Sequence, residues 1–201
     1  MPNTNRPSGL SPVKHLQSTA FNGQGNIYQI PAADVNAFAI GDPVISSGSG
    51  DTNGVPGVTI SLATGPIRGV ILGLGTSEGG TFNPNNLNLT YRPSGAQTTD
   101  WYAIVADDPN LIFEVQEHSN GTALAATEIG LNTVLFQQAN NGFVSGWQVA
   151  SFTDAAPAVT ATLQVRLLGL SRRADNAYGA YAKWLVLINS HELRGGTIGV
   201  A

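Results

Sequence analysis

The sequence predicts an all-β fold, an antiparallel β-barrel or β-sandwich of the jelly-roll or tulip-like type with an extended N-terminal arm and long loops. Short apolar runs recur between clusters of Gly, Pro, Asn, Asp and Ser, at about the 8–12-residue spacing of sandwiches and barrels. One run, Val58-Thr59-Ile60-Ser61-Leu62, alternates apolar and polar residues, as a strand with one solvent-exposed face does. A single short stretch, residues 123–129, has the flanking signals of a helix.

The first 22 residues contain Pro2, Pro7 and Pro12, separated largely by Ser, Thr and Asn. Proline fixes φ and lacks a backbone N–H, which favours extended chain over regular structure. We therefore predict an extended N-terminal arm over residues 1–22 and a single β domain over residues 23–201. Two interpretations of the arm stay open: a loose terminus, or a segment that becomes ordered against a neighbouring subunit.

Five strands are predicted in the first part of the chain, at residues 27–30, 37–40, 44–45, 58–62 and 67–72. Residues 46–54 are polar without apolar periodicity and are predicted as a loop. Residues 75–98 form the longest region without a regular pattern. Because long unpatterned loops in compact domains are uncommon and often functional, we expect this one to pack over a surface of the protein or of a partner.

The remaining strands are predicted at residues 101–105, 111–116, 133–137, 143–149, 159–168 and 184–188. The turn sequence Asp107-Asp108-Pro109-Asn110 separates the first two and predicts a hairpin between them. Asn140-Asn141-Gly142 is a strong two-residue turn signal and predicts a second hairpin, between residues 133–137 and 143–149.

Charged residues make up only 11% of the chain, whereas soluble domains average about 25%. Arginine outnumbers lysine, since Lys14 and Lys183 are the only lysines. Protein–protein interfaces are depleted in Lys and Glu and enriched in Arg and aromatic residues. The composition therefore indicates an assembly subunit whose surface is covered in part by partners.

Several function classes are disfavoured by composition. The formal net charge of −4 argues against a nucleic-acid-binding protein, which usually carries a basic surface. The absence of cysteine excludes disulfides, thiolate catalysis and Cys-ligated metals. The chain starts without the basic and apolar regions of a secretory signal, and no apolar run approaches the length of a membrane span.

Candidate catalytic and metal-binding residues are few. His15, His118 and His191 are far apart in sequence, and none has a second histidine at ligand spacing. The run from Gly73 to Glu78 starts like a dinucleotide fingerprint, but Glu78 replaces the third glycine and would repel a pyrophosphate. We therefore expect no enzymatic activity, no metal and no cofactor.

Asp107 and Asp108 are the only adjacent acidic pair. Adjacent turn carboxylates mostly accept hydrogen bonds from nearby backbone N–H groups, which is the interpretation we favour. The alternative is a calcium site built from both carboxylates, Asn110 and carbonyl oxygens.

Five of the nine basic residues lie in the last 36 positions, interleaved with Tyr178, Tyr181 and Trp184. Such a band suits single-stranded nucleic acid, but the acidic overall balance favours a protein interface, where Arg and aromatic residues dominate the binding energy. Docking of this segment on its own domain is the other interpretation.

Three segments, MPNTNRPSGLSPVKHL, DWYAIVADDPNLIFEVQE and NAYGAYAKWLVLINSHELR, resemble virion structural proteins of tailed bacteriophages, in particular capsid cement or decoration proteins. The similarity runs through nearly the whole chain. It implies a non-enzymatic β-barrel or β-sandwich subunit that is made in the host cytoplasm and sits on the outside of the capsid. There it would bridge subunits of the major capsid protein and stabilise the shell.

The resemblance also implies a homo-oligomer, with a trimer favoured over a dimer, and no nucleic-acid or membrane partner. We expect the barrel to form the oligomer, and the arm and the 75–98 loop to grip the capsid or neighbouring subunits. The residues expected at partner interfaces are Lys14, His15, Leu16, Phe82, Tyr91, Arg172, Arg173, Tyr178 and Tyr181.

Two other function classes remain. One is a different virion surface component, such as a carbohydrate- or receptor-binding β-sandwich with Trp101, Trp147 and Tyr91 as sugar platforms. The other is a hydrolase whose carboxylates come together from distant strands, against which stands the lack of any nucleophile–base pattern.

Overall fold

The computed structural model describes residues 3–78, 81–82, 89–138, 144–196 and 199. Strands in several sheets make up the regular structure, no α-helix occurs among these residues, and nearly all strand pairs are antiparallel. The all-β class predicted from the sequence is confirmed, and the arrangement is consistent with a sandwich- or barrel-like fold.

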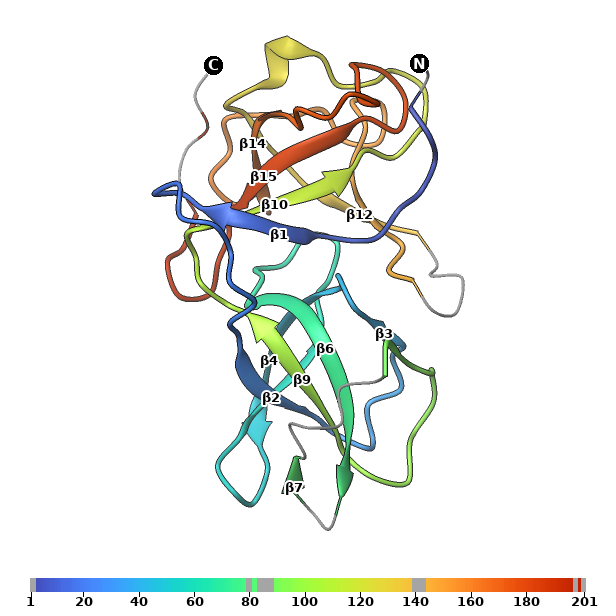
Figure 1. Ribbon diagram of the computed structural model, residues 1–201, viewed down its shortest axis with the longest axis vertical. Helices are drawn as coiled ribbons and strands as arrows, with labels where there is room; N and C mark the ends of the chain where they lie inside the picture. Colours follow the sequence, from blue (N-terminus) through green and yellow to red (C-terminus); the bar gives the residue numbers. More distant parts are fainter. Residues whose placement is uncertain (1–2, 79–80, 83–88, 139–143, 197–198, 200–201) are drawn as a thin grey trace.

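One sheet has five antiparallel strands in the order β1-β10-β15-β14-β11 and occupies the upper part of Figure 1. A two-stranded sheet, β12-β13, lies in the same upper part of the molecule. The bounds of these strands are β1 Ser11–His15, β10 Leu111–Gln116, β11 Asn132–Thr133, β12 Leu135–Gln137, β13 Trp147–Val149, β14 Val165–Leu170 and β15 Lys183–Ile188.

The lower part of Figure 1 is a six-stranded sheet in the order β4-β5-β2-β9-β6-β7. β4 also pairs with β6, which closes five of these strands into a small barrel. A short pair, β3-β8, lies beside it. The bounds are β2 Asn26–Ile30, β3 Phe38–Ala39, β4 Pro43–Gly50, β5 Pro56–Ile60, β6 Gly69–Glu78, β7 Thr81–Phe82, β8 Tyr91–Arg92 and β9 Trp101–Ala106.

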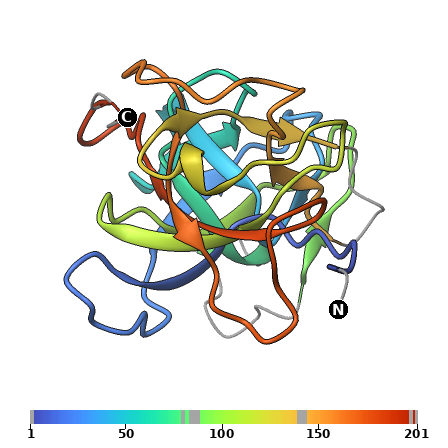
Figure 2. The same cartoon turned by 90° about the horizontal axis from the view of Figure 1, so that it is seen from above.

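Two apolar cores correspond to the two parts. The upper core is built around Trp147, Trp184 and Phe113, and the barrel core contains Phe38 and Trp101. Ile60 packs against both cores. The first residues of β6 and the last residue of β9 reach into the upper core, so the barrel and the sheet are stacked end to end and superimpose in the view along the long axis (Figure 2).

Polar contacts join the two parts where they meet. The Ile67 N–H donates to the carbonyl of Ser190, and the Glu192 N–H donates to the carbonyl of Ile67. Arg68 lies 3.8 Å from the Asp107 carboxylate and 3.9 Å from that of Glu192. These contacts fasten the segment after β15 to the start of β6.

The prediction of a hairpin at residues 107–110 is wrong. β9 belongs to the barrel and β10 to the five-stranded sheet, so the turn carries the chain from one part to the other. The Asp107 carboxylate accepts hydrogen bonds from Asn26 and from the Tyr28 hydroxyl, which holds this end of β9 on the barrel. Turn residues predict a change of direction but do not determine which strands pair.

Other predicted elements differ in extent. The strand predicted at residues 159–168 begins only at Val165, and β4 continues to Gly50 through the predicted polar loop. The predicted short helix is one 3₁₀ turn, Ala126–Glu128. β12 and β13 pair antiparallel, as predicted for the second hairpin, while its Asn-Asn-Gly turn lies outside the described residues.

The N-terminal segment is extended and hydrogen-bonded to the domain from Asn3 onward, and from Leu10 onward it also contributes to the core and to the sheet. β1 pairs with β10 along the edge of the five-stranded sheet, and Leu10 is a buried member of the upper core. Gly9 has a φ of 67°, and a Cβ there would lie 2.3 Å from the carbonyl oxygen of Gly41. The close approach lets the Leu10 N–H donate to that oxygen at 2.9 Å.

Replacing Leu10 by alanine is expected to lower the free energy of unfolding by about 2–4 kcal/mol, because a buried leucine loses its packing and leaves a cavity. Leu16 is the matched control in the same segment, since its exposed fraction is 50% against 1% for Leu10. Leu16→Ala should change the free energy by less than about 0.5 kcal/mol. Urea unfolding of both variants measures the difference, and equal effects would contradict a structural role for this segment.

Candidate partner-binding surface

The outer face of the five-stranded sheet has a broad, shallow groove of about 920 Å³. Side chains of β15 alternate across the sheet, so that Trp184 and Val186 enter the upper core while Leu185 faces the groove. Lining residues come from β1, β14, β15 and the connections beside them. They are Val13, Lys14, Ile129, Leu168, Gly169, Leu170, Ser171, Arg172, Arg173, Asn176, Tyr178 and Leu185.

Apolar side chains in the groove are unusually accessible. Val13, Ile129 and Tyr178 have exposed fractions of 42%, 41% and 48%. Register shifts occur in β1 at Val13 and in β14 before Gly169. Such bulges leave a residue without a ladder partner and re-aim its side chain, which explains how a valine in an edge strand comes to face solvent.

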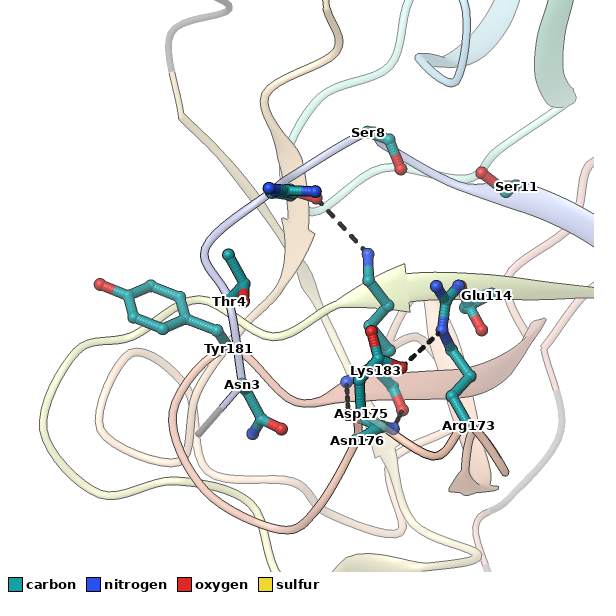
Figure 3. Close-up of a pocket in the computed structure, with 11 residues that line it drawn as sticks. Asn3, Thr4, Ser8, Ser11, Glu114, Arg173, Asp175, Asn176, Tyr181 and Lys183 are labelled. Carbon is teal, nitrogen blue, oxygen red and sulfur yellow. Dashed lines mark hydrogen bonds and ion pairs between the residues drawn. The ribbon is translucent and has the colours of Figure 1, made fainter. Parts of the chain in front are cut away.

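A second, polar hollow of about 400 Å³ lies between the N-terminal segment and the loop 171–182. Figure 3 shows Ser8 and Ser11 on one side, Tyr181 and Asn176 on the other, and Lys183 and Arg173 between them. Arg173 and Asn176 line both hollows. The loop 171–182 is therefore the wall between the groove and the polar hollow.

Side-chain amides hold this loop in place. Asn176 donates to the carbonyls of Ser171 and Lys183 and accepts from the Lys183 N–H, which closes the base of the loop. Asn3 donates to the carbonyls of Ala177 and Ala180, at 2.8 and 2.9 Å. The N-terminal segment thereby fixes the tip of the loop and the position of the aromatic side chains on it.

Positive charge is concentrated on this surface. Among the described residues, Glu114 and Asp175 are the only acidic ones that line the two hollows, and both pair with Arg173, at 3.0 and 3.3 Å. Five basic residues line them, namely Arg6, Lys14, Arg172, Arg173 and Lys183. Burial lowers the pKa of Lys183, and its ammonium group donates to the carbonyl of Arg6.

The structure brings together five of the nine residues predicted at interfaces. Lys14, Arg172 and Tyr178 line the groove, Tyr181 lines the polar hollow, and Arg173 lines both. Sequence reasoning missed Val13, Ile129, Leu185 and Arg6. Neither Leu185 nor Val13 has a signal in a single sequence, because β15 is continuously apolar from Trp184 to Ile188 and a bulge such as that at Val13 leaves no mark.

The other four predicted residues lie elsewhere. The His15 ring Nδ1 is 3.0 Å from the Asp108 carboxylate, and the two residues line a different hollow. Leu16 is exposed after the end of β1. Tyr91 pairs with Ala39 in the β3-β8 sheet beside the barrel. Phe82 pairs through its backbone with Ser77, and its side chain lies outside the described residues.

The receptor-binding alternative predicts that sugars stack on Trp101 and Trp147, and this prediction is wrong. Both are core residues, with exposed fractions of 8% and 1%. Their indole rings are large apolar side chains that fill the barrel core and the upper core respectively, which removes them from any stacking role.

Asp108 accepts a local backbone hydrogen bond, as the turn interpretation predicts, whereas for Asp107 that interpretation is wrong, because its carboxylate accepts from side chains far away in the sequence. Asp108 accepts from the Asn110 N–H at 2.8 Å, and Asp107 accepts from Asn26 and Tyr28. No cluster of three or more His, Cys, Asp or Glu side chains suited to a metal ion occurs in the part of the chain that the structure describes.

His118 and Asp154 form a further polar pair, with 2.8 Å between the ring Nδ1 and the carboxylate. The His118 ring stacks on Phe136. Although burial opposes ionisation of Asp154, hydrogen bonds from Asn120, His118 and Ser151 lower its pKa to about 2. The pair fastens the 151–154 turn to the end of the five-stranded sheet.

Within the described residues, no helix is long and apolar enough to span a membrane. Comparison of the chain with family models, curated proteins and solved structures found no match.

Proposed function

We propose that this protein is a non-enzymatic structural component of a virion that binds the outer surface of a capsid and stabilises the shell by bridging major capsid protein subunits. The observation that carries the proposal is the groove on the five-stranded sheet. It exposes Val13, Ile129 and Tyr178 side by side with basic residues, on a chain that is only 11% charged. Exposed apolar patches of this kind mark interaction sites.

The resemblance to capsid cement or decoration proteins supports the same proposal. A shell presents many identical sites, so that an oligomer of this chain, a trimer or a dimer, would gain affinity by attaching at several points at once. Bridging contacts of this kind need a broad surface and no catalytic machinery.

The test uses empty shells assembled from the major capsid protein of the virus from which the chain comes. The purified protein should co-sediment with them saturably and raise their melting temperature, because a ligand that binds only the assembled shell stabilises it. Val13→Asp should weaken binding at least about tenfold. The matched control is Val35→Asp, at an exposed valine with a 63% exposed fraction outside the groove, and it should bind as the wild type does.

Absence of saturable binding by the wild-type protein would contradict the proposed function. Equal loss of binding in the Val13 and Val35 variants would show that the groove is not the contact. Light scattering at two protein concentrations provides the accompanying measurement of the oligomer, for which a stable multiple of 20.9 kDa is expected.

A further inference from the structure

Charge separates this surface from the rest of the molecule. Five of the nine basic residues line the two hollows, with two of the thirteen acidic residues, a surplus of three positive charges. The remaining four basic and eleven acidic residues lie elsewhere in the chain. A positive surface on an acidic protein favours a negatively charged partner.

Three of the five cations are available to such a partner. Arg173 is engaged by Glu114 and Asp175, and the Lys183 ammonium group donates to a backbone carbonyl. Among the residues that the structure describes, Arg6, Lys14 and Arg172 have no ion-pair partner. Arg172 is exposed, while Lys14 is half-buried beside Val13.

Face-to-face pairing of two copies of this chain through the groove is disfavoured by the same charges. A two-fold axis would place the same surface on both sides of the interface, so that each copy would bring its positive surplus against that of the other. Like charges that meet in an interface cost several kcal/mol.

The edge of the five-stranded sheet that β1 forms is not free to add a strand from a partner. Pro12 has no N–H to donate. The Phe21 N–H donates to the carbonyl of Val13, and the His15 N–H donates to that of Thr19. The chain that follows β1 therefore folds back along it, and a partner is recognised by side chains across the face of the sheet.

We propose that the groove binds a segment of a partner protein in which apolar side chains are flanked by Asp or Glu. The apolar side chains pack against Val13, Leu168 and Leu185, and the carboxylates pair with Lys14 and Arg172 at the rim. This deepens the proposed function, on which it rests for the identity of the partner as the shell protein. The chemistry of the segment follows from the groove itself.

The probes are three capped seven-residue peptides with a Leu-Val-Leu centre and two Glu, two Lys or two Ser residues on each side. Titrated into the full-length protein and followed by amide NMR, the Glu peptide should bind at least about tenfold more tightly than the Ser peptide. The Lys peptide should not bind. Affected amides should lie in β1, β14, β15 and the loop 171–182, and binding should weaken as salt rises from about 50 to about 300 mM.

Arg172→Glu should weaken binding of the Glu peptide at least about fivefold. Arg194→Glu is the matched control, because it makes the same charge change at an exposed residue outside the groove. Equal effects of the two variants, equal affinity for the Glu and Lys peptides, or no binding of the Glu peptide at about 5 mM would each overturn the proposal.

The shell experiment separates this inference from the proposed function. Binding of the Glu peptide in the groove, together with failure of the wild-type protein to bind shells, contradicts only the proposed function. Shell binding that is unchanged in Arg172→Glu overturns the inference and leaves the proposed function standing.

Discussion

Replacing Trp184 by alanine is expected to lower the free energy of unfolding by about 3–5 kcal/mol, the usual range for loss of a buried tryptophan. The indole is fully buried in the upper core. Its N–H donates to the Glu117 carboxylate at 2.9 Å. The variant therefore loses apolar packing and also leaves a buried carboxylate with one donor fewer.

Trp184→Phe separates the two contributions, because it keeps most of the apolar volume and removes the N–H donor. Its cost should be smaller, about 1–3 kcal/mol, the range for leaving a buried polar group unpaired. Urea unfolding at constant pH measures both variants. A Trp184→Ala protein within about 1 kcal/mol of the wild type would show that β15 does not anchor the upper core.

Stability should depend on pH through two buried carboxyl groups. Burial raises the pKa of Glu117 from 4.5 to about 7 and that of Asp42 from 3.8 to about 6. Because the folded pKa values lie above the unfolded ones, the folded state binds more protons between them. The stabilisation is fully present below about pH 4 and is lost as the pH rises through about 6 to 7. At about 1.4 kcal/mol per pH unit, each group accounts for about 3 kcal/mol.

The contribution of each group is isolated by comparing pH slopes, since other groups act in the opposite direction. Burial lowers the pKa of His191, so this residue costs stability as the pH falls below its unfolded value. Relative to the wild type, the loss of stability between about pH 5 and pH 8 should shrink by about 2.5 kcal/mol in Glu117→Gln and by about 1.4 kcal/mol in Asp42→Asn, because only the part of each titration above pH 5 falls in this range. Urea midpoints across that range measure the slope, and slopes identical to that of the wild type in both variants would contradict the prediction.

The strands were the part of the fold most accessible from sequence. Val58 to Leu62 alternates, and residues 184–188 are continuously apolar; each predicted run overlaps a strand, β5 and β15 respectively. Pairing was less accessible because it depends on contacts between distant residues. The clearest case is Asp107, whose hydrogen bonds to Asn26 and Tyr28 hold it on the barrel and prevent the predicted hairpin.

The candidate surface was accessible only in part. Arg172, Arg173, Tyr178 and Tyr181 stand together in the sequence, and their loop forms the wall between the two hollows. That Lys14 would lie beside them follows from the pairing of β1 with β10 and of β10 with β15. Such pairing has no local sequence signal.

Closure of the barrel has a bearing on aggregation. β4 pairs with both β5 and β6, so each of the five closed strands has a neighbouring strand on either side. At the edge of the other sheet, Pro12 and the returning chain at Phe21 give β1 similar protection. Free strand edges are the usual route to sheet-to-sheet aggregation. A chain with so few charges to keep its copies apart thus has backbone pairing to oppose aggregation at the barrel strands and at β1.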